Sequence, residues 1–72
     1  MNDLKRKIDY AVVCVNEFAK CYKLQPKQAF IYLYRNKAIE FIKEYYDVEH
    51  TLSIDDAVED MAVVCRNNGG TY

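Results

Sequence analysis

The chain has 72 residues, of which 51% are hydrophobic and 29% are charged, and its formal net charge is −1. This length holds one domain, and no hydrophobic run approaches the roughly 20 residues that a membrane-spanning helix needs. The slight negative charge disfavours a protein that binds nucleic acid over its whole surface, because most affinity for DNA comes from neutralised phosphates.

The first predicted element is a helix over about residues 3–22. Asn2 or Asp3 can cap its start. Hydrophobic residues then recur at spacings of three and four, which is the period of one helix face. We therefore expect one unbroken stripe to face the core. It consists of Leu4, Ile8, Ala11, Val15, Phe18 and Tyr22.

A short second helix is predicted over about residues 26–35. Pro26 fits its first turn, where the missing N–H costs nothing. Phe30 and Leu33 are expected to face inward. A turn should follow, with Asn36 in the left-handed region that asparagine tolerates.

A third helix is predicted over about residues 37–46, followed by a connector over residues 47–52. Ser53 then resembles a helix cap, and a fourth helix should run over about 54–67 and stop at the Asn-Asn-Gly-Gly sequence. The result is an all-α bundle of about four short helices in one domain, residues 1–72, with its core over about 3–67 and a short tail at 68–72. The side chains expected to be largely buried are Leu4, Ile8, Val15, Phe18, Phe30, Leu33, Ile39, Ile42, Val58 and Met61.

Residue types that carry catalysis are scarce in this chain. Histidine occurs once, at His50, whereas a catalytic triad needs a nucleophile, a base and a third group. Three cysteines, Cys14, Cys21 and Cys65, form an odd set without a secretion signal, which indicates reduced thiols in the cytoplasm. A structural zinc site needs about four ligands at short spacings. The sequence therefore predicts no catalytic residue, no cofactor and no metal, and a protein that is not an enzyme.

Basic and acidic residues are divided between the two halves of the chain. Residues 1–37 carry eight basic and three acidic residues, and residues 38–72 carry two basic and eight acidic ones. Mutual neutralisation within one fold is one explanation. The other is an interface, because like charges four residues apart on a helix repel. The acidic residues that we expect at such an interface are Asp55, Asp56, Glu59 and Asp60.

A helix-turn-helix DNA-binding regulator is the alternative hypothesis, since short helices joined by tight turns suggest that motif. Its recognition helix would be residues 26–35, with Lys27, Gln28, Tyr32 and Arg35 outward. The acidic C-terminal half leaves only the N-terminal half to approach a duplex, so nucleic acid is not the expected partner.

Several segments together resemble the bacterial domain-of-unknown-function family 3791. The most specific is a Tyr-Asp-x-x-His-Thr signature with a Glu-Asp pair in the last helix. The resemblance covers about residues 4–65. Glu49 stands where the family usually has an apolar residue, which argues against a buried connector. The segments are Ile8 with Val12 and Val13, Cys14 to Ala19, Leu24, Gln28 to Phe30, Ala38 to Ile42, Tyr46 to Thr51, and Val58 to Met61.

The resemblance implies a bacterial, antitoxin-like or accessory protein that binds another protein. We expect His50 to hydrogen-bond a nearby carboxylate or backbone group and to fix the connector. The surplus of apolar and aromatic residues also leads us to expect a homodimer. The signature residues could form one structural or docking cluster: Tyr46, Asp47, His50, Thr51, Glu59 and Asp60.

Overall fold

Helices account for all the regular structure in residues 3–71, the part of the chain that the computed structural model describes. This confirms the all-α fold class. None of these helices has the length and apolar character needed to cross a bilayer. In chain order they are α1 (Asp3–Tyr22), α2 (Pro26–Arg35), α3 (Ala38–Glu44), α4 (Tyr46–Glu49) and α5 (Ile54–Asn67).

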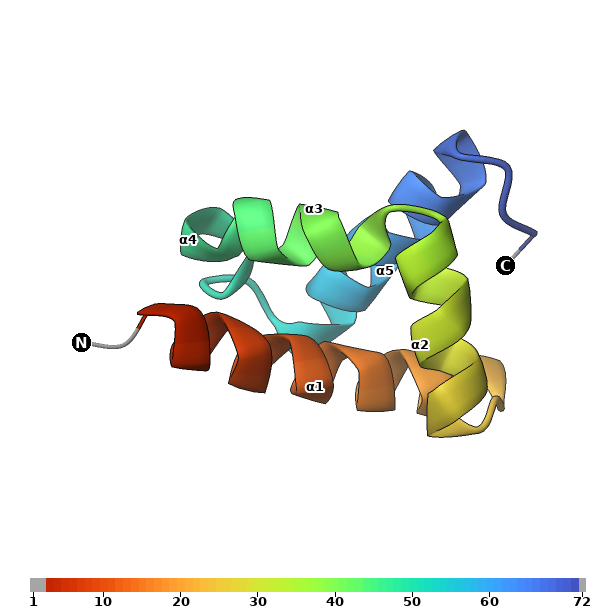
Figure 1. The fold of residues 1–72 in the computed structure, drawn as a ribbon, viewed down its shortest axis with the longest axis horizontal. Helices are drawn as coiled ribbons and strands as arrows, with labels where there is room; N and C mark the ends of the chain where they lie inside the picture. The colour runs from red at the N-terminus through yellow and green to blue at the C-terminus, as the bar shows by residue number, and fades with distance from the viewer. Residues whose placement is uncertain (1–2, 72) are drawn as a thin grey trace.

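The helices surround one core and cross at different angles (Figure 1). α1 runs along one side, α2 turns across its C-terminal end, and α3 returns alongside α1. α4 continues from the far end of α3, and α5 packs against both α1 and α3. The predicted limits of the first, second and fourth helices are confirmed. The suggested cap Asn2 and the terminal Tyr72 lie outside the described residues.

The turn between α2 and α3 differs from the prediction in one residue. Lys37 adopts the left-handed conformation, with φ 72°, whereas Asn36 has φ −103°. The Asn36 side-chain amide donates a hydrogen bond to the Tyr32 carbonyl, 2.9 Å away. Asn36 thus satisfies a carbonyl at the end of α2, and the next residue makes the reversal.

The predicted third helix is divided in two. α3 ends at Glu44, and the backbone bends at Tyr45 (φ −104°, ψ 26°). The Tyr45 carbonyl then accepts hydrogen bonds from the amides of Val48 and Glu49, at 3.1 and 2.8 Å. The segment expected to be a connector therefore begins with the helical turn α4.

α5 begins and ends as the sequence predicts. The Ser53 hydroxyl accepts a hydrogen bond from the Asp56 amide at 3.1 Å, which caps the first turn. At the other end Gly69 has φ 94°, and the Gly70 amide donates to the Cys65 carbonyl at 2.7 Å. A left-handed glycine after the last turn is a common way to end a helix.

The core is built from every helix except α4. Cys14 and Cys65 lie in it as free thiols, and Cys21 is free and exposed. Close packing of this kind makes the removal of even a few methylene groups costly. The largest fully buried side chains are Phe18, Leu33, Ile42, Met61, Cys14 and Cys65.

Three of the ten side chains predicted to be buried are exposed. Leu4 is 65% exposed, Ile8 49% and Phe30 46%. Leu4 and Ile8 lie in the first turns of the 20-residue α1, and the helices that pack against α1 are shorter. The apolar stripe therefore extends beyond the core that covers it. The seven that are buried as predicted are Val15, Phe18, Leu33, Ile39, Ile42, Val58 and Met61.

This difference predicts unequal effects of two leucine substitutions. Leu33→Ala should lower the free energy of unfolding by about 3 kcal/mol, because it leaves a cavity in a fully buried site. Leu4→Ala should lower it by less than about 0.5 kcal/mol, because this side chain is largely exposed. Urea denaturation followed by circular dichroism measures both, and equal losses would contradict the assigned core.

Candidate functional site

The six signature residues lie in separate groups. The rings of Tyr46 and His50 are stacked, with centroids 4.4 Å apart and planes 7° apart. The Thr51 hydroxyl donates to the Val48 carbonyl at 2.6 Å. Asp47 and Glu59 are exposed, and Asp60 is partly buried. The contacts of Tyr46, His50 and Thr51 hold α4 together. Asp60 belongs to a different set of contacts.

His50 fixes the end of α4, as expected, through a backbone group. Its Nδ1 lies 2.6 Å from the Tyr46 carbonyl oxygen, which accepts the hydrogen bond. We expected His50 to lie near Glu59 or Asp60. The contacts that orient its ring are instead with Tyr46. His50 is also exposed. Removal of its side chain therefore does not leave a buried polar group without a partner, which would cost about 1–3 kcal/mol.

Glu49, which was not among the predicted site residues, is the buried acid of the described residues. Its side chain is 5% exposed, and Oε1 has no hydrogen-bond partner among the described residues. Burial raises the pKa of Glu49 to about 7, helped by a hydrogen bond with Asp60 and by the negative charge there. The carboxyl therefore changes its protonation near neutral pH and not near its usual pKa of 4.5, because an isolated buried carboxylate is strongly disfavoured.

Tyr10 and Cys14 of α1 face the same acid. The Tyr10 hydroxyl donates to the Glu49 backbone carbonyl at 2.9 Å, and its ring meets Tyr46 edge-on at 5.5 Å. Burial raises the pKa of the Cys14 thiol to about 11. A protonated, fully buried thiol is a poor nucleophile. These contacts tie α4 to α1.

The inward position of Glu49 had a signal in the sequence. The family resemblance implies an apolar residue at this position, and an apolar preference in a polar segment indicates a side chain that faces the core. Glutamate at this position was interpreted as weakening the case for a buried connector, and the other five residues of the predicted connector, 47, 48 and 50–52, are indeed exposed. The backbone keeps the inward orientation, and the carboxyl accommodates it by pairing with Asp60.

The predicted acidic interface is reduced to three exposed residues, Asp55, Asp56 and Glu59. Asp60 is partly buried and hydrogen-bonded to Glu49. Asp55 and Asp56 lie in the first turn of α5, where negative charge stabilises the helix dipole. Their positions thus have a structural reason that does not require a partner.

The acidic groups do not assemble into a metal site. Within residues 3–71, no three or more His, Cys, Asp or Glu side chains are arranged to hold a metal ion. Glu59 instead borders a depression of about 230 Å³ that also contains the guanidinium of Arg66. The positive charge moderates the acidic character of this surface.

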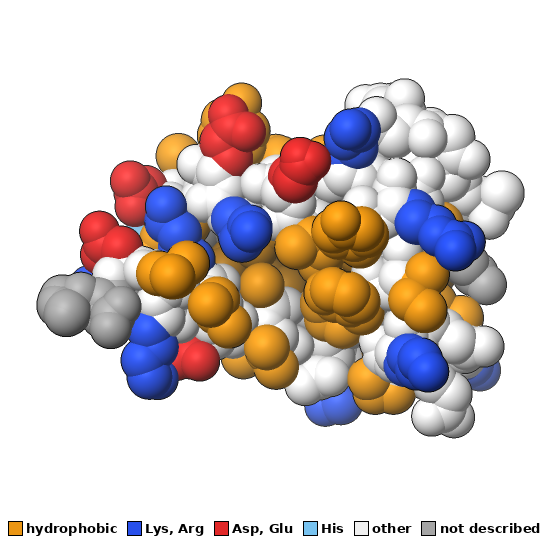
Figure 2. All heavy atoms as spheres, viewed as in Figure 1, with side chains coloured by type: hydrophobic (Ala, Val, Ile, Leu, Met, Phe, Trp, Pro, Cys, Tyr) orange, Lys and Arg blue, Asp and Glu red, His pale blue; other side chains and the backbone are white. Residues whose placement is uncertain are grey.

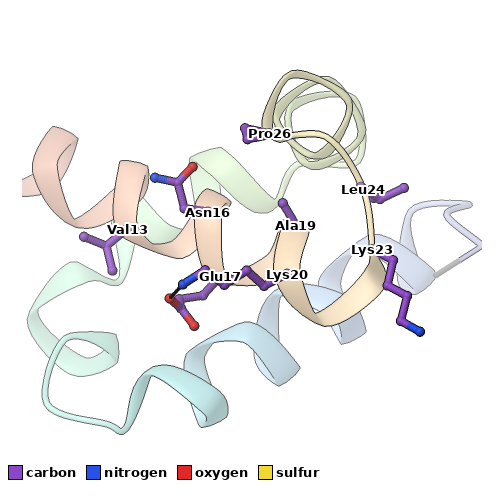
Figure 3. A pocket seen from close by; sticks show the side chains of 8 residues that line it. All are labelled: Val13, Asn16, Glu17, Ala19, Lys20, Lys23, Leu24 and Pro26. Atoms are coloured by element: carbon purple, nitrogen blue, oxygen red, sulfur yellow. Dashed lines mark hydrogen bonds and ion pairs between the residues drawn. The ribbon is translucent and has the colours of Figure 1, made fainter.

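A larger depression of about 530 Å³ lies between the end of α1 and the start of α2 (Figure 3). Glu17 and Lys20 cross part of it as an ion pair, with 3.3 Å between Oε2 and Nζ. The Lys23 side chain extends away from the others (Figure 3). A surface lined by long charged side chains is not shaped to hold one ligand in one orientation.

An apolar groove of about 350 Å³ lies between α1, α2 and α3, and we call it the α1–α2–α3 groove. Figure 2 shows hydrophobic side chains gathered over these helices, with both basic and acidic side chains around them. Val15 and Ile39 are buried within it, and Lys43 stands at one wall. It is lined by Ile8, Ala11, Val12, Val15, Asn16, Phe30, Tyr34, Ile39 and Lys43.

The side chains of this groove are exposed in pairs one helical turn apart. Ile8 and Val12 of α1 are 49% and 53% exposed, and Phe30 and Tyr34 of α2 are 46% and 64% exposed. The Phe30 and Tyr34 rings lie nearly parallel, with centroids 6.0 Å apart. Apolar side chains that are exposed together in this way are candidates for an interaction site. The two residues whose burial was wrongly predicted, Ile8 and Phe30, thus belong to one surface.

Glu49 makes the stability of this protein fall as the pH rises. Its folded pKa is raised from 4.5 to about 7, so the folded state binds the proton more tightly than the unfolded state. The stabilisation is complete below about pH 4.5 and is lost as the pH rises through about 7. We expect this residue to contribute a loss of about 1–3 kcal/mol between pH 5 and 8.

Glu49→Gln should remove that contribution, because the amide is neutral at every pH and keeps the shape of the side chain. Urea denaturation at pH 5 to 8 measures the difference between the two proteins. Glu44→Gln, an exposed position on α3, is the control and should retain the wild-type profile. Parallel curves for wild type and Glu49→Gln would show that Glu49 titrates normally.

His50→Ala should lower the free energy of unfolding by less than about 1 kcal/mol, because the side-chain hydrogen bond and the ring stacking it removes are exposed. Thermal unfolding monitored by circular dichroism checks this. A loss above about 2 kcal/mol would mean that His50 supports buried structure.

Comparison with known proteins places the chain in a family without assigning it an activity. No curated protein and no solved structure matches it. The model of the family described as "Protein of unknown function (DUF3791)" matches residues 9–68. These residues include α2, α3, α4 and α5 and most of α1. The chain belongs to this family of proteins of unknown function.

Proposed function

We propose that this protein is a non-enzymatic interaction module that binds another protein through the α1–α2–α3 groove. The observation that carries the proposal is the half-exposed apolar surface formed by Ile8, Val12, Phe30 and Tyr34 on two helices. Removing apolar area from water stabilises a complex by about 25 cal/mol per Å² before the costs of association. The groove offers such area, and Val15 and Ile39 give it a packed floor.

The polar residues of the chain support a binding role over a catalytic one. Glu49 and Cys14 both have a raised pKa, and both are buried in the structural contacts between α4 and α1. His50 is engaged with Tyr46. Nothing in these arrangements presents a reactive atom together with a base at one cleft, as catalysis requires.

The DNA-binding alternative loses one of its proposed contacts. Tyr32, expected to point outward from α2, is partly buried and stacks on Phe18 with ring centroids 5.9 Å apart. Lys27, Gln28 and Arg35 are exposed, as that alternative requires. Three side chains on a ten-residue helix are a small set for reading and holding a duplex. We therefore favour a protein partner.

The antitoxin-like or accessory role implied by the family resemblance is one form of this function, with the partner bound in the cytoplasm. The acidic surface of Asp55, Asp56 and Glu59 would then be a second contact rather than the main one. Exposed charges at the edge of an interface chiefly affect the association rate and its salt dependence. Apolar side chains buried at the centre contribute most of the affinity.

Val12→Asp tests the groove, because it places a charge among apolar side chains without removing a core residue. Val63→Asp is the matched control, since Val63 is a similarly exposed valine on α5 outside the groove. The partner is first captured from the native bacterium and purified, and its affinity is then measured by titration calorimetry. We expect Val12→Asp to weaken binding at least about tenfold and Val63→Asp to leave it within about twofold.

The opposite pattern would contradict the proposal. If Val12→Asp binds the purified partner normally and Glu59→Lys abolishes binding, the acidic surface is the docking site. Circular dichroism of each variant shows whether the helices are retained.

A further inference from the structure

Resting on the proposed function, we infer that the occupant of the α1–α2–α3 groove is an amphipathic helix of another protein, with acidic residues flanking its apolar stripe. The spacing of the side chains that line the groove suits such a helix. Ile8 and Val12 on one wall and Phe30 and Tyr34 on another are each four residues apart. A docking helix presents its own apolar side chains at the same spacing.

Other modes of peptide recognition fit this surface less well. Addition of a strand needs an exposed sheet edge, and residues 3–71 contain no strand. Proline-rich segments dock in grooves lined by aromatic rings. Here the rings of Phe30 and Tyr34 form one wall, while the α1 wall and the floor are aliphatic.

The charge of the groove selects acidic flanks. Lys43 is one of the residues that line the groove, and none of the lining residues is acidic. Lys43 makes no ion pair with the other described residues. Lys27 precedes Tyr34 by seven residues and so lies on the same face of α2. The nearest acid along α1, Asp9, is engaged by Lys5 at 2.8 Å. A helix with Asp or Glu beside its apolar stripe would therefore pair with Lys43 and Lys27 at the edges of the contact.

A second copy of this chain is a poorer occupant, although the composition led us to expect a homodimer. Two grooves facing each other across a twofold axis would bring Lys43 and Lys27 of each copy together, and like charges across an interface are costly. The acidic, apolar surface near Val48 and Asp47 belongs to α4, a single four-residue turn. It cannot present apolar side chains over the several turns that the groove accommodates.

Two synthetic helices of about 18 residues test the inference. Both carry leucines at the same helical spacing, and the flanking positions are all Glu in one and all Lys in the other. Fluorescence anisotropy at low salt measures affinity, and amide shifts in nuclear magnetic resonance spectra locate the binding. We expect the Glu-flanked peptide to bind at least about tenfold more tightly, with shifts at Val12, Tyr34 and Lys43.

Lys43→Glu should weaken binding of the Glu-flanked peptide about fivefold and strengthen that of the Lys-flanked one. Lys20→Glu, an exposed position outside the groove with the same charge change, is the control and should leave both affinities within about twofold. Equal binding of both peptides in the groove would contradict the inference that the docking helix has acidic flanks, but it would not contradict the proposed docking function. If neither peptide shifts the resonances of groove residues, both the inference and the proposed docking function are contradicted. Sedimentation that shows a dimer whose groove residues shift on dilution would identify a second copy as the occupant.

Discussion

α1 is a helix of 20 residues, about 30 Å long, and the three helices that pack against it have 10, 7 and 14 residues. Those helices enclose only one small core against α1. It is centred on Phe18, Leu33, Ile42 and Met61. The apolar face of α1 continues past that core toward its N-terminus. This mismatch in length determines which side chains are buried, and it produces the surface on which the proposed function depends.

The same limited core explains why α4 is attached by polar contacts. A single turn of helix has too little apolar surface to hold itself in place, and its exposed Val48 contributes nothing to packing. The Tyr10 hydroxyl and the Glu49–Asp60 pair join it to α1 and α5 instead. The attachment of α4 is sensitive to pH, because the contact between Glu49 and Asp60 depends on a proton held between two carboxyls.

Periodicity and caps were sufficient to predict most of the fold. The stripe from Val15 to Tyr22, the proline at the start of α2 and the serine before α5 each act within one or two helical turns, and the structure follows them. The break at Tyr45 could not be predicted from local pattern, and the turn that follows it is held by a distant residue, since the Tyr10 hydroxyl donates to the Glu49 carbonyl. Burial of Leu4, Ile8 and Phe30 was wrongly predicted for a related reason: a period identifies a face but not how far a neighbouring helix covers it.

The candidate site shows the same limit of prediction from the sequence. The acidic cluster in α5 was conspicuous in sequence because its charges are adjacent, yet Asp55 and Asp56 serve the helix start and Asp60 pairs with Glu49. The groove was inconspicuous because Ile8, Phe30 and Lys43 come from three helices and look like ordinary members of an amphipathic pattern. Only packing separates apolar residues that are covered from those that are not. In a chain this small, the residues left uncovered by that geometry are the ones available for a partner to bury.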